Sequence, residues 1–250
     1  MKPPLLLSLC SIFIFGSLYA ANGDGDANGV TSPTPELIPF KISEVYVPEG
    51  FDDNDNLQVV VEGFFPNGCY KVAPASITTK NGTFKIQANA YRYYGFCIQM
   101  IVPFQQVVDL GIHAAQIYNI HAVGQGELKK LNVKASSNPG PDDYTYAPIK
   151  QIYVSRNPDN PSKRRVLLSG EFTLSCLRIT RVEVSVHHNV IIVLPIAEVD
   201  RANQCNEGIF PFEVSQELPD VEDGRYLVHV RTLNGNSFNR VITLGNAFLF

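Results

Sequence analysis

Asn81-Gly82-Thr83-Phe84-Lys85-Ile86-Gln87-Ala88 joins a turn signal to a strand signal within eight residues. Asn-Gly is the strongest short-range signal of a β-hairpin, because both residues tolerate the positive φ angles of the two-residue turn. The six residues that follow alternate between apolar and polar, the period of a strand with one buried face. This stretch therefore predicts β-structure.

The segments on either side have the same character. Apolar or alternating runs separated by turn signals occupy residues 57–61, 97–103, 105–110, 117–123 and 128–133, and the run from Cys97 to Leu110 is expected to be a strand broken at Pro103. They predict about seven short strands. No segment keeps a helical period of apolar residues over three turns, so the predicted class is all-β.

The chain also contains an internal repeat. Val45-Tyr46-Val47 matches Ile152-Tyr153-Val154, and Gly63 and Cys69 match Gly170 and Cys176, all 107 positions apart. From the next cysteine onward the offset is 108, so one inserted residue separates two runs of unbroken alignment. A repeat near 100 residues is long enough for each copy to bury its own core.

Four cysteines follow the first twenty residues, and the repeat predicts how they pair. Each copy contains one pair, Cys69 with Cys97 and Cys176 with Cys205, and the spacing is nearly equal in the two copies. Two intradomain disulfides are therefore predicted, whereas four cysteines alone would allow three connectivities. Disulfides of this kind indicate an oxidising, extracytoplasmic compartment.

The first twenty residues are interpreted as a cleaved signal peptide. Lys2 precedes an apolar run from Leu5 to Leu18, and the small residues Ala20 and Ala21 offer a cleavage site. The run is too short for a comfortable membrane span, so no transmembrane segment is expected in the mature chain. A lipoprotein anchored at Cys10 is the alternative, although Leu9 occupies the position where a small residue belongs.

Composition predicts the remaining boundaries between the segments of the chain. Residues 21–40 are rich in Gly, Asn, Asp and Pro and are expected to be a flexible leader, and residues 135–147 have the composition of a linker. The predicted organisation is thus a signal peptide (1–20), the leader (21–40), repeat 1 (41–134), the linker (135–147) and repeat 2 (148–250).

Each copy carries a Leu eight positions before a Tyr, Leu110 with Tyr118 and Leu218 with Tyr226. These pairs resemble the tyrosine corner of Greek-key sandwiches, and seven strands per copy resemble tandem immunoglobulin-like or fibronectin type III domains. The resemblance implies a β-sandwich in each copy, with each Tyr hydroxyl bonded to upstream backbone. The chain lacks the core Trp of antibody-type domains, since it contains no Trp at all.

One acidic cluster is a candidate metal site. Asp52, Asp53 and Asp55 lie within four positions, and their order with Asn54 and Asn56 resembles the calcium-binding linker motif of cadherins. The cluster lies between the first two strands of repeat 1, far from the linker in sequence. A solvated turn is therefore the favoured interpretation, and no cofactor is expected, with calcium as the alternative.

The residues exclude some classes of function but do not identify one. The net charge of −4 argues against a nucleic-acid binder. No nucleophile, metalloprotease or phosphate-loop motif occurs, and the repeated His121 and His229 are expected to be exposed on their strands. The sequence predicts a non-catalytic binding or structural module of the cell envelope or extracellular space, with a protein or cell-surface component as partner. A soluble inhibitor or carrier that presents sandwich loops to a protein, or a hydrolase with a site built from loops, are the alternatives.

Overall fold

The turn at Asn81-Gly82 has the backbone conformation that its sequence predicts. Asn81 and Gly82 have φ angles of 49° and 68° in the computed structural model, which describes residues 33–137, 139–140, 142–160, 163–202 and 204–244. They connect β4 (Tyr70–Lys80) to β5 (Thr83–Arg92) as an antiparallel hairpin. The same kind of hairpin, β11 (Leu177–His187) with β12 (Val190–Val199), recurs in repeat 2 through His188, which also has a positive φ.

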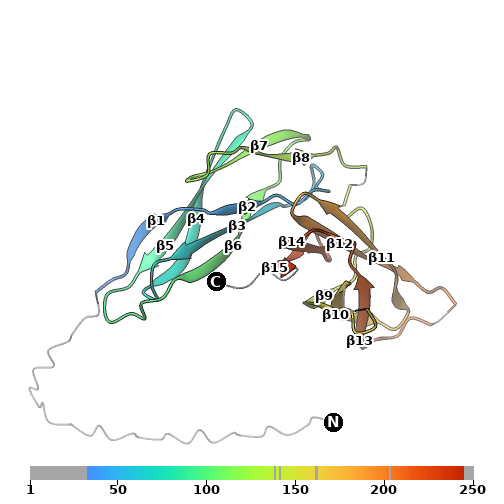
Figure 1. Ribbon diagram of the computed structural model, residues 1–250. Coiled ribbons are helices and arrows are strands. Elements are labelled where there is room, and N and C mark those ends of the chain that lie inside the picture. Colours follow the sequence, from blue (N-terminus) through green and yellow to red (C-terminus); the bar gives the residue numbers. More distant parts are fainter. Residues whose placement is uncertain (1–32, 138, 141, 161–162, 203, 245–250) are drawn as a thin grey trace, which may run out of the picture. The chain divides into compact units, whose positions relative to one another are not determined.

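The described chain is built from strands alone (Figure 1). Besides the hairpin strands, repeat 1 contains β1 (Glu36–Phe40), β2 (Glu44–Tyr46), β3 (Leu57–Phe65), β6 (Val102–Gly111), β7 (Gln116–Ala122) and β8 (Lys129–Val133). Repeat 2 contains β9 (Ile149–Arg156), β10 (Arg164–Leu174), β13 (Glu207–Glu217), β14 (Gly224–Arg231) and β15 (Ser237–Leu244). No helix among these residues is long and apolar enough to span a membrane.

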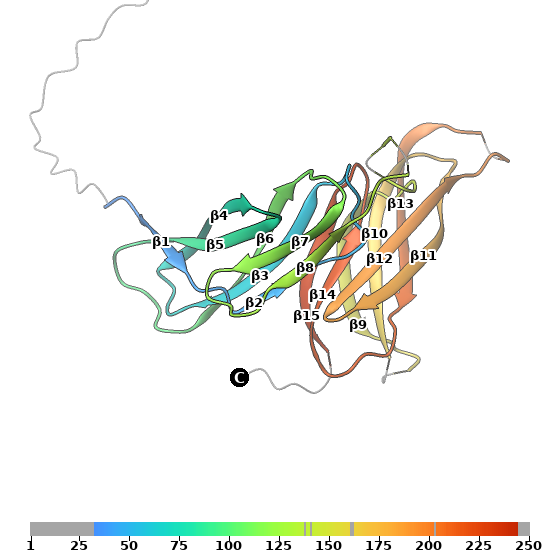
Figure 2. The same cartoon turned by 90° about the horizontal axis from the view of Figure 1, so that it is seen from above.

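The two repeats have the same strand order in their sheets. In repeat 1, one sheet has the order β2-β3-β6 and the other contains β4, β5, β7 and β8, with β1 also paired to β5. In repeat 2, the corresponding sheets are β9-β10-β13 and β11-β12-β14-β15, and Figure 2 shows β11 beside β12 and β14 beside β15. Seven strands match one for one, which confirms the all-β prediction of two β-sandwich copies.

One pairing in each copy differs from what the resemblance to immunoglobulin-like domains implies. β5 pairs with β7 in parallel, through residues 83–86 and 119–122, and β12 pairs with β14 in parallel, through residues 190–193 and 227–230. The two sheets of an immunoglobulin-like sandwich are antiparallel. The chain therefore has a sandwich architecture with its own strand order.

Each repeat encloses its own apolar core. The core of repeat 1 includes Phe84, Ile86, Val59 and Val61, and that of repeat 2 includes Val166, Leu168, Ile191 and Val193. The alternation seen in the sequence places these residues on the inner faces of their strands, since successive side chains point to opposite faces.

The repeated glycines allow close packing inside both sandwiches. A Cβ atom at Gly63 would lie 2.5 Å from the Phe104 ring, and one at Gly170 would lie 2.1 Å from the Pro148 carbonyl oxygen and 2.7 Å from the Phe212 ring. No real Cβ contact is that short, so the ring can pack over the strand only where a side chain is missing.

A third apolar cluster joins the repeats. Tyr46 and Val60 of repeat 1 pack with Val190, Ile192 and Leu227 of repeat 2, and all five are buried. Val60 lies between Val59 and Val61, so its side chain points to the face opposite the core of repeat 1. The described residues from Thr34 onward accordingly belong to one compact unit.

Two expected boundaries shift. β1 forms within the predicted leader, since Glu36–Phe40 pairs with residues 88–92 of β5. The end of the predicted linker already belongs to repeat 2, because the Ala147 amide donates to the Pro195 carbonyl and the Ala197 amide donates to the Thr145 carbonyl, both at 2.8 Å. The predicted signal peptide and Cys10 lie outside the described residues.

Candidate functional site: an apolar loop closed by a disulfide

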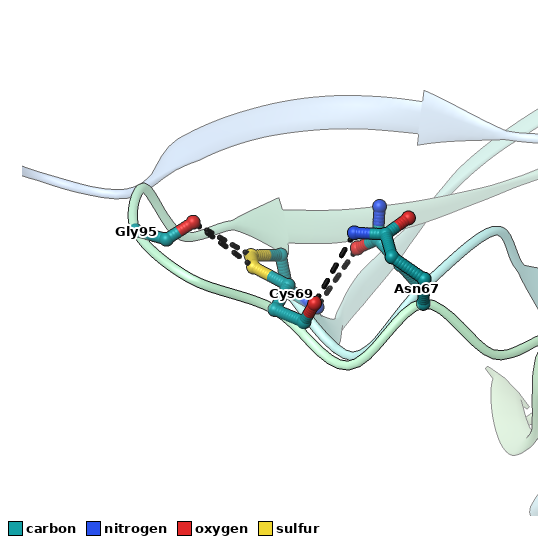
Figure 3. The surroundings of a disulfide bond; sticks show 5 residues. Asn67, Cys69 and Gly95 are labelled. Carbon is teal, nitrogen blue, oxygen red and sulfur yellow. Dashed lines mark hydrogen bonds between the residues drawn. A yellow bond between two sulfur atoms is a disulfide. The ribbon is translucent and has the colours of Figure 1, made fainter.

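The predicted disulfides are both present. Cys69 is bonded to Cys97 and Cys176 to Cys205, one bridge in each repeat. Cys69 directly precedes β4, and Cys97 lies within the connection between β5 and β6. The Asn67 side-chain oxygen accepts a hydrogen bond from the Cys69 amide at 2.9 Å, and the Gly95 carbonyl faces the bridge (Figure 3).

The bridge of repeat 1 closes a loop whose large side chains face solvent. We call residues 93–101, from Tyr93 to Ile101, the apolar loop. Phe96 is fully exposed, and Ile98, Met100 and Ile101 are exposed by 72%, 55% and 68%. Tyr93 and Tyr94 are also exposed, so six large apolar or aromatic side chains crowd into nine positions. Clusters of this kind on a soluble protein mark interaction sites.

The backbone of the apolar loop is held by hydrogen bonds within repeat 1. The Gly68 amide donates to the Ile98 carbonyl at 2.9 Å, and the Tyr93 amide donates to the Cys69 carbonyl at 2.9 Å. The side chain of Gln99 turns back and donates to the Cys97 carbonyl at 3.1 Å. The loop is therefore ordered, although its apolar side chains pack on little else.

Charged and phenolic groups surround the start of the loop. Lys71 lies over the Tyr93 ring, with its Nζ 5.1 Å from the ring centre, and Arg92 lies over the Tyr94 ring at 5.4 Å. Glu36 pairs with Arg92 and accepts a hydrogen bond from the Tyr94 hydroxyl at 3.1 Å. Hydrogen bonding by the Tyr94 side chain and the charge of Glu36 raise the pKa of Arg92, so the cation is retained at every accessible pH.

The equivalent loop of repeat 2 has a different chemistry. At the offset of 108, Tyr93, Phe96, Ile98 and Met100 align with Arg201, Gln204, Asn206 and Gly208. We call the described residues that align with the apolar loop, 201–202 and 204–209, the twin loop, and its last three residues already belong to β13. Among them, Ile209 is the one large apolar side chain exposed. Two loops with the same disulfide framework thus present different surfaces, so the bridge does not require apolar neighbours.

The sequence prediction missed this site. The run from Cys97 to Pro103 was expected to form a strand, but β6 begins at Val102 and continues through Pro103. An apolar run gives the same signal whether it is buried in a sheet or exposed in a loop. The signal that could have located the site is the difference between residues 93–101, which are mostly apolar, and the aligned residues 201–209, which are mostly polar.

The predicted acidic cluster has a structural environment that the sequence did not indicate. Asp55 and Arg231 form an ion pair at 2.6 Å between the repeats, with side chains exposed by only 3% and 6%. Asp52 is buried as well, and burial is the main reason that its pKa is raised. The interpretation as a solvated turn is therefore wrong for Asp52 and Asp55.

The cluster also contacts the linker from which the sequence separated it. The Ser136 amide donates to the Asp53 carboxylate at 2.9 Å, and the Asn54 side chain donates to the Gly140 carbonyl at 2.7 Å. The hydrogen bonds from the Ser136 side chain and amide lower the pKa of Asp53. The chain folds back so that this turn lies at the junction of the repeats.

The three candidate calcium ligands have protein partners. Asp55 accepts from Arg231 and from the Asp52 amide, Asp53 from the Ser136 amide, and Asp52 from the Asn54 amide. Within the described residues no group of three or more His, Cys, Asp or Glu side chains is placed to hold a metal ion. Calcium independence stays a prediction.

His229 is buried at the same junction, whereas the sequence predicts that it is exposed on its strand. Its Nδ1 donates to the Asn239 side-chain oxygen at 2.8 Å, and its ring lies 5.7 Å from that of Phe51. Burial lowers the pKa of His229 to about 4, so the ring is neutral near pH 7. Its counterpart His121 is only partly buried.

The two predicted tyrosine corners differ in environment. Tyr118 and Leu110 are both buried in the core of repeat 1, and the Tyr118 hydroxyl donates to the Ala114 carbonyl at 2.9 Å. Tyr226 is half-buried, and Leu218 is buried in the core of repeat 2. The assignment of both as tyrosine corners stays a prediction.

Comparison with known proteins adds one finding. A family model described as an ORF11 β-sandwich domain matches residues 59–133, which run from β3 to the end of β8 and include the apolar loop. The description agrees with the sandwich architecture of repeat 1. No curated protein and no solved structure matches the chain.

Proposed function

We propose that the chain is a non-catalytic binding module of the extracytoplasmic space that attaches to its target through the apolar loop of repeat 1. The observation that carries the proposal is the exposure of Phe96, Ile98, Met100 and Ile101 in one disulfide-closed loop. Exposed apolar side chains are common singly, but a cluster of them on one loop is a feature of interaction sites and reduces solubility. A target that covers them explains their presence.

The arrangement of scaffold and loop supports the proposal. Binding residues commonly occur on loops that a rigid scaffold positions, and here the loop follows β5 and is tied to the start of β4. Ordering before binding reduces the entropy lost when the target is engaged. The two disulfides support an extracytoplasmic location, because disulfides persist in oxidising compartments.

The twin loop provides the residues for a variant that tests this proposal. Replacing Phe96→Gln, Ile98→Asn and Met100→Gly gives repeat 1 the residues that repeat 2 carries at the same positions. We call this protein the triple variant. Because the three side chains are exposed, the variant is expected to keep the disulfides and the thermal stability of the wild-type chain.

The experiment measures saturable binding of the labelled full-length chain to the extracellular and envelope fractions of the source organism. Burying an apolar side chain contributes roughly 1.5–3 kcal/mol, so the triple variant is expected to bind at least tenfold more weakly. The control Ile209→Ser removes the exposed apolar residue of the twin loop and is expected to bind as the wild type does. Equal binding by the wild type and the triple variant would refute the proposal.

A further inference from the structure

Resting on this proposed function, we propose that the target is a lipid bilayer, into whose interfacial region the apolar loop inserts Phe96, Ile98, Met100 and Ile101. The loop protrudes rather than forming a groove, since Phe96 is fully exposed and its neighbours are more than half exposed. A protruding apolar surface must enter its target, and a bilayer accepts any such shape. The structure therefore favours a lipid surface over a protein with a matching pocket.

Several polar groups of the loop are already paired within the protein. Gln99, the one side chain at positions 96–101 with a strong hydrogen-bonding group, donates to the Cys97 carbonyl. The Ile98 carbonyl accepts from the Gly68 and Met100 amides at 2.9 and 3.0 Å. Transfer of unpaired polar groups out of water is costly, and these groups would enter an apolar phase with their hydrogen bonds formed. A loop that binds a protein through polar contacts would keep such groups free.

The order of residue types along the loop matches the layers of a membrane surface. The apolar residues 96, 98, 100 and 101 are preceded by Tyr93 and Tyr94, whose rings are apolar and whose hydroxyls are polar, the type that gathers at membrane interfaces. Lys71 and Arg92 lie over those rings. Long cationic side chains extend toward headgroups while their stems stay in apolar surroundings.

The charges also suit a lipid surface. No acidic residue occurs at positions 93–101, so nothing in the loop opposes its approach to phosphate headgroups. Glu36 pairs with Arg92, which leaves the positive charge at the base small. Apolar insertion, rather than attraction to anionic lipid, is therefore expected to dominate the binding.

The first test is co-sedimentation of the full-length chain with vesicles of pure phosphatidylcholine and of phosphatidylcholine with a quarter phosphatidylserine. The wild type is expected to bind both, with at most a tenfold preference for the anionic vesicles and little loss at 0.5 M salt. The triple variant is expected to lose at least tenfold, and Ile209→Ser none. Binding by the triple variant at the wild-type level, or wild-type binding that is confined to anionic vesicles and abolished by salt, would overturn insertion.

The second test uses the absence of Trp from the chain. Phe96→Trp places a single Trp at the proposed insertion point, and Gln204→Trp places one at the same position of the twin loop. Addition of phosphatidylcholine vesicles is expected to shift the emission of the first protein to shorter wavelength and to make it sensitive to brominated lipid. The second is expected to remain unchanged. An unchanged spectrum from Phe96→Trp would refute insertion.

The outcomes separate this inference from the proposed function. Loop-dependent binding to the envelope fraction without binding to vesicles, lost after protease treatment of that fraction, would identify a protein target and overturn only the lipid inference. Failure of the loop substitutions to change binding to either target would overturn both.

Discussion

At the scale of single residues, the junction between the repeats depends on one buried cation. Arg231 lies between the rings of Phe51 and Tyr146, at 5.7 and 5.5 Å from their centres, and pairs with Asp55. A buried charge without its partner is strongly destabilising, typically by about 3–5 kcal/mol. The acidic cluster therefore owes its composition at least partly to this pairing.

The pairing of Asp55 leads to a prediction about calcium. Binding would require the ion to displace Arg231 and to gather six to eight oxygen ligands, and the three carboxylates already accept hydrogen bonds from different donors. We expect the melting temperature to be the same in millimolar calcium and in chelator. A site filled at a hundred times its dissociation constant would instead stabilise the chain by about 2.7 kcal/mol. A rise of several degrees that Asp55→Ala abolishes would show that calcium binds.

The buried histidine predicts a pH dependence. Because the folded chain depresses the pKa of His229 from 6.5 to about 4, the unfolded state binds a proton more readily between these values. Stability from this group is complete above pH 6.5 and is lost as pH falls toward 4, on the order of 3 kcal/mol in total. Asp52, whose raised pKa acts in the opposite direction, is common to both proteins in the comparison below.

Urea unfolding of the wild type and of His229→Gln between pH 7 and pH 4.5 measures the effect. The Gln side chain can still donate to Asn239 but does not titrate in this range. The variant is expected to lose less stability on acidification than the wild type. Parallel pH profiles would show that His229 is not the responsible group.

Tyr118 gives a prediction at the same scale. Its buried hydroxyl donates to the Ala114 carbonyl, so Tyr118→Phe leaves that carbonyl without its partner. The expected loss is about 1–3 kcal/mol in the free energy of unfolding. Tyr226→Phe, at the half-buried counterpart, is expected to cost less. Unchanged unfolding for Tyr118→Phe would mean that the hydroxyl contributes nothing to stability.

At the scale of elements, removing the two disulfides one at a time distinguishes their contribution to stability from their contribution to binding. Closing loops of 28 and 29 residues stabilises a domain by roughly 3–4 kcal/mol in the chain-entropy account. Replacing either cysteine pair by Ala should therefore reduce stability by similar amounts. Only the loss of Cys69 and Cys97 should also weaken vesicle binding, because that bridge holds the apolar loop. Equal effects of both double variants on binding would mean that the apolar loop does not need the Cys69–Cys97 disulfide in order to bind.

The elements also show how far the sequence could predict the fold. Thr83–Ala88 and Leu57–Val61 were recognised as strands because alternation and β-branched residues report burial on one face, and both lie in β5 and β3. The apolar loop was misjudged because the same residue types are exposed there. The parallel pairing of β5 with β7 has no local signature, since either direction buries the same faces.

At the scale of the whole molecule, the contacts between repeats could not be predicted. Asp55 and Arg231 are 176 positions apart, and the burial of His229 and Val60 depends on the docking of one sandwich against the other. A periodic pattern reports a buried face but not what covers it. The internal repeat predicted two similar folds, whereas the docking surfaces differ between the copies and therefore leave no repeated signal.

The docking leads to a prediction about truncation. Repeat 2 has its own core and disulfide, so a fragment of residues 146–250 is expected to unfold cooperatively. It should be less stable than the full-length chain, because Val190, Ile192 and Leu227 lose the residues that cover them. Thermal melting of both proteins with the disulfides intact makes the comparison. A fragment without a cooperative transition would show that the copies depend on a shared core.

The parallel pair in each repeat has a consequence for the order of folding. β4 and β5 meet across a two-residue turn, and β7 and β8 are neighbours in the chain, but β5 and β7 are separated by β6 of the opposite sheet. Local contacts form early, whereas contacts between distant segments must overcome a larger loop-closure entropy. The β4-β5-β7-β8 part of the sheet in repeat 1 and the β11-β12-β14-β15 sheet of repeat 2 should thus each arise from two hairpins that merge only after the chain has crossed between sheets. The Cys69–Cys97 bond lies on the β4–β5 side of this crossing, so it holds the first hairpin together but leaves the separation between β5 and β7 unchanged.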